Sequence, residues 1–309
     1  MEKTAIYNEK SYKGHLLVLS ANIIWGLNSP IAKNVLNHLT ALSVTTYRMM
    51  GAAAAFWILS LFLPQEKIEK KDRIRIFFAS LFAVVFNQGL FIFGLSKTSP
   101  IDASIITTTA PILTMIASAL FLKEPITHKK IAGVVVGAAG AITLILSGQV
   151  NANTVSSGLG NALIFTAQCS FALYLTVFRN LITRYSPVTI SKWLFLYASL
   201  CFLPFSFNDL KALPYSTIET SLWFQLSFVV LGATFLAYLC MMSAQRLLRP
   251  TLISVYNNIQ PIVATLLTLG LGMDKMGWDK ALAISLVFIG VYIVTQSKSK
   301  ADLEKRPKD

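Results

Sequence analysis

The chain has 309 residues, of which 54% are hydrophobic and only 13% are charged, and its mean hydropathy is +0.60. Soluble domains carry roughly 25% charged residues, so this composition excludes a protein whose whole surface faces water. The net charge of +13 could suit nucleic acid. However, the basic residues stand at the ends of apolar runs, and no basic stripe interleaves with polar residues. We therefore expect a membrane protein that does not bind nucleic acid.

Ten apolar runs come close to the length of about 20 residues that a bilayer-spanning helix needs. In chain order they cover residues 15–36, 40–63, 74–95, 99–122, 130–147, 158–181, 188–207, 222–245, 250–271 and 279–296. The first run contains Asn22, Trp25 and Asn28 and lacks a following small-x-small cleavage pattern, so we expect it to stay as a helix. No connection is long enough to form a soluble domain. The sequence predicts an all-α integral membrane protein with ten transmembrane helices.

Lysine and arginine predict how the runs are oriented. With a cytoplasmic N-terminus, twenty basic residues fall in cytoplasmic segments and five in outer ones, two more lying within runs. Cytoplasmic loops of membrane proteins carry the excess of Lys and Arg. We expect a multi-pass protein of the plasma or inner membrane, in contact with the lipid bilayer, with both termini in the cytoplasm.

The two halves of the chain resemble each other. Gly14–Tyr47 aligns with Gly160–Trp193 without a gap, and further along Pro111 meets Pro261. Each half has five runs, an odd number, so the second half enters the membrane from the opposite side. Inverted repeats of this kind hold a substrate near mid-membrane, between the halves. The predicted parts are a cytoplasmic segment at 1–13, a first repeat at 14–147, a second, inverted repeat at 158–297 and a cytoplasmic tail at 298–309.

Several short motifs carry a family resemblance. They are the stretch Gly94–Ser104, the Pro111-Ile-Leu that follows, Leu122-Lys-Glu-Pro, the glycines from Gly133 to Gly140, and Asn22-Ile-Ile-Trp-Gly-Leu-Asn. Together they resemble the drug/metabolite transporter superfamily in its EamA-like ten-helix branch, in which an arginine usually stands where Arg48 does. The second copy departs from the pattern, with Asp274 and Lys275 where the first has Glu124 and Pro125. The resemblance implies a transporter, commonly an exporter of amino acids, metabolites or drugs.

Polar side chains within the runs are the candidates for a substrate cavity, because such groups usually face the bundle interior. The residues that we expect to line it are Asn22, Trp25, Asn28, Ser29, Asn87, Gln88, Thr107, Thr108, Gln168, Tyr174, Tyr238, Tyr256, Asn257 and Gln260. Aromatic walls with neutral hydrogen-bonding groups suit an amphipathic or zwitterionic small molecule better than a bare ion. For any single residue, a hydrogen bond that only holds helices together is the alternative.

Two charged residues and two prolines within the runs admit more than one interpretation. Arg48 and Asp102 are candidates for a gate, for proton coupling or for a structural ion pair, and Asp102 could instead be solvated at the helix mouth. Pro111 and Pro261 each remove a backbone hydrogen bond, so we expect kinks that serve either the cavity or packing. Proton antiport and facilitated diffusion are both left open as the energy source.

Other function classes lack the residues that they need. The histidines His15, His38 and His128 stand far apart at run ends, and no HExxH, P-loop or Rossmann motif occurs. We therefore expect no enzyme, no metal site and no cofactor. The spacing of the glycines in the fifth run predicts packing within the chain, so we expect a monomer or weak homodimer. A membrane scaffold or receptor without transport is the main alternative to alternating-access transport, and a membrane-embedded enzyme is the second.

Overall fold

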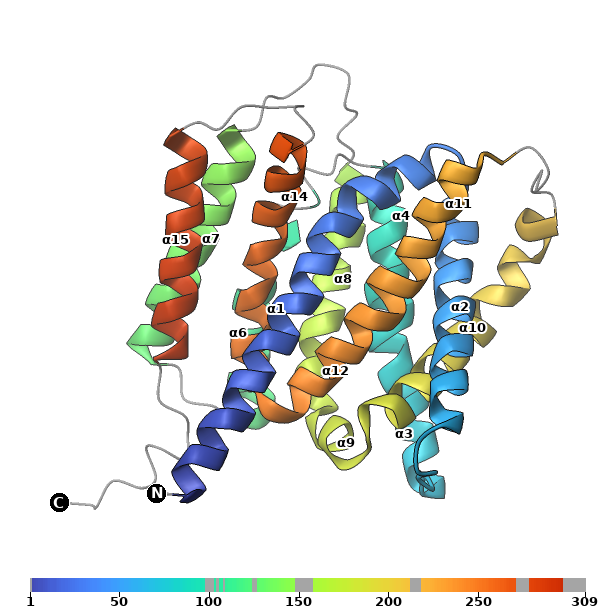
Figure 1. Ribbon diagram of the computed structural model, residues 1–309, viewed down its shortest axis with the longest axis horizontal. Coiled ribbons are helices and arrows are strands. Elements are labelled where there is room, and N and C mark those ends of the chain that lie inside the picture. The colour runs from blue at the N-terminus through green and yellow to red at the C-terminus, as the bar shows by residue number, and fades with distance from the viewer. Residues whose placement is uncertain are drawn as a thin grey trace.

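The computed structural model describes residues 2–97, 103, 106–107, 109–123, 127–147, 158–211, 218–270 and 278–296, and all the elements described there are helical (Figure 1). The α-helices are α1 (Glu2–Leu36), α2 (Ala41–Leu61), α3 (Lys70–Ser80), α4 (Leu90–Lys97), α6 (Ala110–Leu122), α7 (His128–Ser147), α8 (Gly158–Val177), α9 (Arg179–Arg184), α10 (Pro187–Lys211), α11 (Thr220–Ser227), α12 (Ala237–Leu247), α13 (Pro250–Val255), α14 (Ile259–Gly270) and α15 (Trp278–Thr295). Two π-helices, η1 (Leu81–Gly89) and η2 (Phe228–Leu236), and a 3-10 turn, η3 (Tyr256–Asn258), complete them.

The outside of the bundle is apolar. Five spans in the described part are long and apolar enough to cross a membrane: Tyr12–Leu36, Lys70–Lys97, Gly158–Val177, Pro187–Lys211 and Thr220–Leu247. Large apolar side chains such as Leu120, Phe205 and Phe224 are exposed along the helices. In water such a surface would mark an interface, whereas lipid tails cover it favourably. The predicted all-α membrane fold is confirmed.

The two halves repeat each other in local structure. Each contains a nine-residue π-helix within its third membrane helix, η1 between α3 and α4 and η2 between α11 and α12. The second helix of each half also begins alike, because Thr40 accepts a hydrogen bond from the Ser43 amide at 3.1 Å and Ser186 accepts one from the Thr189 amide at 3.1 Å. These caps stand 146 residues apart, at the offset of the sequence repeat. The fold is therefore built from two inverted five-helix repeats.

The fifth helix of each half, α7 and α15, pack side by side at one edge of the bundle (Figure 1). A Cβ atom added to Gly290 would lie 2.4 Å from the Gly137 nitrogen and 2.7 Å from the Gly133 carbonyl oxygen. Only glycine allows two backbones to approach so closely. The glycines of the fifth run thus serve a contact within the chain.

Pro111 and Pro261 each stand just after an interruption of regular α-helix. Pro111 is the second residue of α6, and Pro261 is the third residue of α14, which directly follows the 3-10 turn η3. Proline fits the first turn of a helix because the amide that it lacks has no partner there. Asn257, which lies in η3, lines the cavity described next.

Candidate substrate cavity

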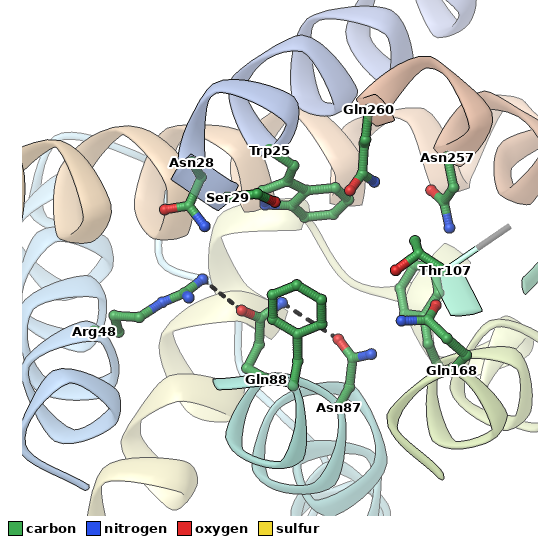
Figure 2. A pocket seen from close by; sticks show the side chains of 12 residues that line it. Trp25, Asn28, Ser29, Arg48, Asn87, Gln88, Thr107, Gln168, Asn257 and Gln260 are labelled. Atoms are coloured by element: carbon green, nitrogen blue, oxygen red, sulfur yellow. Dashed lines mark hydrogen bonds between the residues drawn. The ribbon is translucent and has the colours of Figure 1, made fainter. Parts of the chain in front are cut away.

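A cavity of about 50 Å³ lies where the two repeats meet (Figure 2). A buried water molecule needs about 10–15 Å³ on this measure, so the space holds a few waters or a small group of a ligand. A larger solute requires the surrounding helices to move apart. The lining residues are Trp25, Asn28, Ser29, Arg48, Asn87, Gln88, Phe91, Thr107, Gln168, Phe171, Asn257 and Gln260.

Equivalent positions of the two repeats face this cavity. Trp25 on α1 and Phe171 on α8 are 146 residues apart, and Thr107 and Asn257 are 150 residues apart. Residues at equivalent places in inverted repeats approach each other at the pseudo-two-fold axis, near the middle of the membrane. The cavity therefore lies at the position that the sequence repeat predicts for a substrate.

A chain of hydrogen bonds crosses the cavity floor from α2 to α8 (Figure 2). The Arg48 guanidinium donates from Nε to the Thr234 hydroxyl at 2.9 Å and from Nη2 to the Gln88 side-chain oxygen. Gln88 in turn donates to the Asn87 side-chain oxygen at 3.3 Å, and Asn87 donates to the Ala167 carbonyl at 3.0 Å. These bonds hold each polar group in one orientation.

Three buried atoms in the cavity wall have unused hydrogen-bonding capacity within the described structure. They are the Asn28 side-chain oxygen, the Arg48 Nη1 nitrogen and the Asn257 side-chain oxygen. A buried polar group without a partner costs about 1–3 kcal/mol, so such groups concentrate where water or a ligand completes them. The residues of the wall thus include one cationic donor and two neutral acceptors that have no partner within the described structure.

Four residues predicted to line the cavity do not line it, and two of them, Asn22 and Tyr238, stand directly behind lining residues. Asn22 accepts from the Gln260 side chain at 2.8 Å and donates to the Val18 carbonyl, so it positions Gln260. The Tyr238 hydroxyl donates to the Ala83 carbonyl of η1 at 2.9 Å, and its ring lies 5.7 Å from that of Trp25. Both side chains face the bundle interior, as their helical spacing predicts, but other side chains lie between them and the cavity.

The other two tyrosines lie further toward the end of the bundle at which α1 begins. The Tyr174 hydroxyl contacts Met242 Sδ at 3.0 Å and the Gln245 side chain at 3.3 Å. The Tyr256 hydroxyl is 2.7 Å from His15 Nδ1. In both tyrosines the hydroxyl lies at the end of a long side chain, and it bonds to groups outside the cavity. Thr108 and Asp102 lie outside the described residues.

Three cavity residues were not predicted as lining. Phe171 could have been found, because it aligns with Trp25 in the repeat. Phe91 carries no such signal, since a phenylalanine in an apolar run equally suits lipid contact. Arg48 was predicted as a gate or ion-pair residue, whereas the structure places its guanidinium in the cavity wall, where no carboxylate of the described residues pairs with it.

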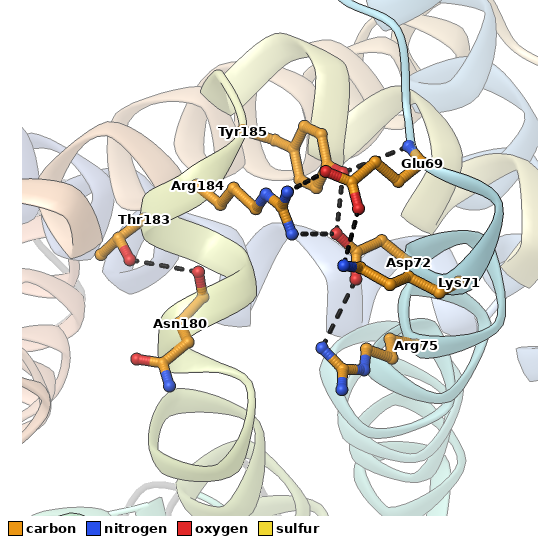
Figure 3. A network of polar contacts seen from close by, with 8 residues as sticks. All are labelled: Glu69, Lys71, Asp72, Arg75, Asn180, Thr183, Arg184 and Tyr185. Atoms are coloured by element: carbon orange, nitrogen blue, oxygen red, sulfur yellow. Dashed lines mark hydrogen bonds and ion pairs between the residues drawn. The ribbon is translucent and has the colours of Figure 1, made fainter.

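An ion network joins the two repeats at the end of the bundle where α1 begins (Figure 3). Arg184, the last residue of α9, contacts Asp72 at 2.9 Å and Glu69 at the start of α3. The Tyr185 hydroxyl also donates to Asp72, at 2.8 Å, and the Asp72 side chain is only 1% exposed. Burial and the hydrogen bond to Asp72 raise the pKa of Tyr185, so its hydroxyl stays a donor at neutral pH. We call this group, with Arg75 and Lys71 at its rim, the ion network.

The equivalent place at the opposite end is hollow. Glu219 stands at the N-cap position of α11 as Glu69 does for α3, and His38 stands 146 residues before Arg184. These residues line a cavity of about 320 Å³, which we call the end cavity, together with Asn34, Leu39, Ile218, Ser221, Leu222 and Gln225. Asn34 donates to Gln225 there at 2.8 Å. Charged groups thus join the two repeats at one end, whereas at the other the equivalent segments enclose a cavity and meet through the Asn34–Gln225 hydrogen bond and apolar contacts.

Two inverted helical repeats that enclose a polar cavity define a membrane transporter of the inverted-repeat kind. The family model described as the EamA-like transporter family matches the chain twice, at residues 12–146 and 158–296. The chain belongs to the EamA-like transporter family, and the predicted resemblance to drug/metabolite transporters is confirmed.

Curated relatives cover nearly the whole chain. The uncharacterized transporter YyaM of Bacillus subtilis is 23% identical over 282 residues, which is 90% of this chain and 92% of that protein. An uncharacterized transporter of Archaeoglobus fulgidus is 24% identical over 283 residues, 91% and 99% of the two chains. The WAT1-related protein At5g13670 of Arabidopsis thaliana is 21% identical over 92% of this chain and 84% of its own length. A solved crystal structure shares the fold, with a TM-score of 0.72 at 16% identity over 91% of this chain and 96% of that one.

Proposed function

We propose that the protein exports a small organic solute, such as an amino acid, a metabolite or a drug, across the plasma or inner membrane by alternating access. The membership of a transporter family supports transport as the activity. The observation that carries the mechanism is the difference between the two ends of the bundle, one joined by the ion network and the other hollow at the equivalent residues.

In a protein built from inverted repeats, a difference between the two ends indicates how access could alternate between the two sides of the membrane. Two copies of one fold that adopt different conformations can exchange them, and the exchange opens the closed end and closes the open one. In the exchanged state Arg184 would separate from Asp72, and the end cavity would collapse around His38 and Glu219. A solute in the central cavity would then face the other side of the membrane.

The central cavity is the proposed binding site. Trp25 donates from its indole nitrogen to the Ala233 carbonyl of η2 at 2.8 Å, which holds its ring as a fixed wall. Asn257 contributes an acceptor that is free within the described structure. Protons are the candidate coupling ion, with facilitated diffusion as the alternative.

Flux in liposomes tests the proposal. Compounds that raise the melting temperature of the purified protein are first selected, and their uptake is then measured in proteoliposomes. Trp25→Ala and Asn257→Ala should lower flux, because they remove the wall and leave a solute group unpaired at a loss of about 1–3 kcal/mol. Phe62→Ala is the control, since Phe62 is 80% exposed at the end of α2. A folded protein that binds compounds yet moves none would favour the scaffold or receptor alternative.

A further inference from the structure

We propose that the central cavity recognises a carboxylate, or an anionic group of similar size, on its solute through the guanidinium of Arg48. The inference deepens the proposed function by assigning a chemical class to the solute. It concerns binding, however, and can be tested whether or not the bound molecule is transported.

Arg48 is a cation enclosed in the bundle with part of its hydrogen-bonding capacity unused. It is 1% exposed, and among the described residues its partners are the neutral side chains of Thr234 and Gln88. Its Nη1 nitrogen has no hydrogen-bond partner, and the side chain extends from α2 toward the cavity (Figure 2). A buried charge without a counter-charge is strongly unfavourable, particularly at membrane depth. An anionic ligand would supply both the missing charge and the missing acceptor.

The neighbours of Arg48 hold the guanidinium ready for such a ligand. The Thr234 hydroxyl donates to the Val229 carbonyl at 2.7 Å, so its oxygen is left to accept from Arg48 Nε. The Gln88 amide donates to Asn87, which directs the Gln88 oxygen toward Arg48. Because the guanidinium is already oriented, an anion binds without ordering it further. The planar fork of arginine suits a carboxylate better than the single point charge of lysine does.

The remaining cavity wall suits the rest of such a solute. The free side-chain oxygens of Asn28 and Asn257 accept hydrogen bonds, so they match a hydroxyl or amino group rather than a second anion. Trp25, Phe91 and Phe171 provide apolar surface. The class that fits is a small carboxylate with an apolar body and a hydrogen-bond donor.

Matched acids and amides test the charge requirement directly. Acetate, benzoate and phenylacetate are each compared with the corresponding primary amide, which keeps the shape and removes the charge. Binding to the purified wild-type protein is measured as a concentration-dependent rise in melting temperature. We expect at least one acid to bind at least ten-fold more tightly than its amide. If no acid in the series is preferred over its amide, the inference is wrong.

Variants of Arg48 test whether this residue causes the preference for the acid over its amide. Arg48→Gln should abolish the ten-fold preference, Arg48→Lys should retain part of it, and Arg75→Gln, which removes a charge at the rim of the ion network, should leave it unchanged. A preference that survives in Arg48→Gln would overturn the assignment. If Arg48→Gln does not fold, Arg48→Lys and the wild-type comparison still decide, since a guanidinium-dependent site predicts weaker acid binding in the lysine variant.

Asp102 provides a further control. If its carboxylate, rather than a ligand, neutralises Arg48 in the membrane, Asp102→Asn should create an acid preference that the wild type lacks, and that result would also overturn the inference. Uptake of the preferred acid by proteoliposomes separates this inference from the proposed function. Binding without uptake contradicts transport and leaves the anion site standing. Uptake of acid and amide alike contradicts the anion site and leaves transport standing.

Discussion

The substitution Asp72→Asn should shift the protein toward a state that is open where the ion network now closes it. Asp72 accepts from Arg184 at 2.9 Å and from Tyr185 at 2.8 Å with a side chain that is 1% exposed. Asparagine keeps the size and one acceptor but removes the charge. Hydrogen bonds to charged groups are worth about 1.5–3 kcal/mol, and because Arg184 is 44% exposed we reduce the expected loss to about 1–2 kcal/mol. That corresponds to a change of about 5- to 30-fold in the ratio of the two states.

Cysteine labelling at both ends reports this ratio. In a background with the three native cysteines replaced by serine, Ser221→Cys marks the end cavity and Val188→Cys, buried beside the ion network, marks the closed end. We expect Asp72→Asn to lower the ratio of the Ser221 to the Val188 labelling rate by about 5- to 30-fold. Both rates depend on the same equilibrium, so their ratio changes even where one state predominates.

The matched control for this experiment is Lys71→Gln. Lys71 pairs with Glu69 at 2.9 Å, but its side chain is 66% exposed, and exposed pairs contribute about 0–1 kcal/mol. The labelling ratio should therefore change little. If Asp72→Asn leaves the ratio as in the wild type while the protein stays folded, the ion network does not hold this state, and the reasoning is refuted.

Two further predictions concern packing and topology. Gly290→Ala should destabilise the protein by about 1–3 kcal/mol, since the new Cβ meets the α7 backbone and cannot move aside. Gly158→Ala, with open space around it, is the control, and equal melting temperatures for the two variants would contradict this account. Cysteines placed at Asn153 and Ser299 should label from opposite sides of the membrane, because the positive-inside pattern predicts ten helices with both termini in the cytoplasm. Labelling of both from one side would refute the predicted helix count.

The sequence by itself determined the membrane fold and its symmetry. Long apolar runs are a property of local composition, and the bilayer requires their backbone amides to be satisfied within each helix. The repeat of Gly14–Tyr47 at Gly160–Trp193, with five runs in each half, predicts a cavity between the halves. The sequence also predicts a cavity residue among Asn257, Asn258 and Gln260, because three amides within four residues include one that faces inward whatever the exact rotation of the helix.

Only the tertiary structure decided which inward side chains line the cavity and which stand behind it. Helical spacing gives the face on which Asn22 and Tyr238 lie, but not the depth at which a neighbouring helix meets them. The π-helices η1 and η2 could not be predicted either, because no residue type signals a shift from i→i−4 to i→i−5 hydrogen bonding. Arg48 illustrates the limit best. Its partners Gln88 and Thr234 are 40 and 186 residues away, so its place in the cavity depends on how three helices pack. The closed and hollow ends also differ in sequence, since Leu222 and His38 stand where the ion network has Asp72 and Arg184, but only the tertiary structure shows which of these residues meet.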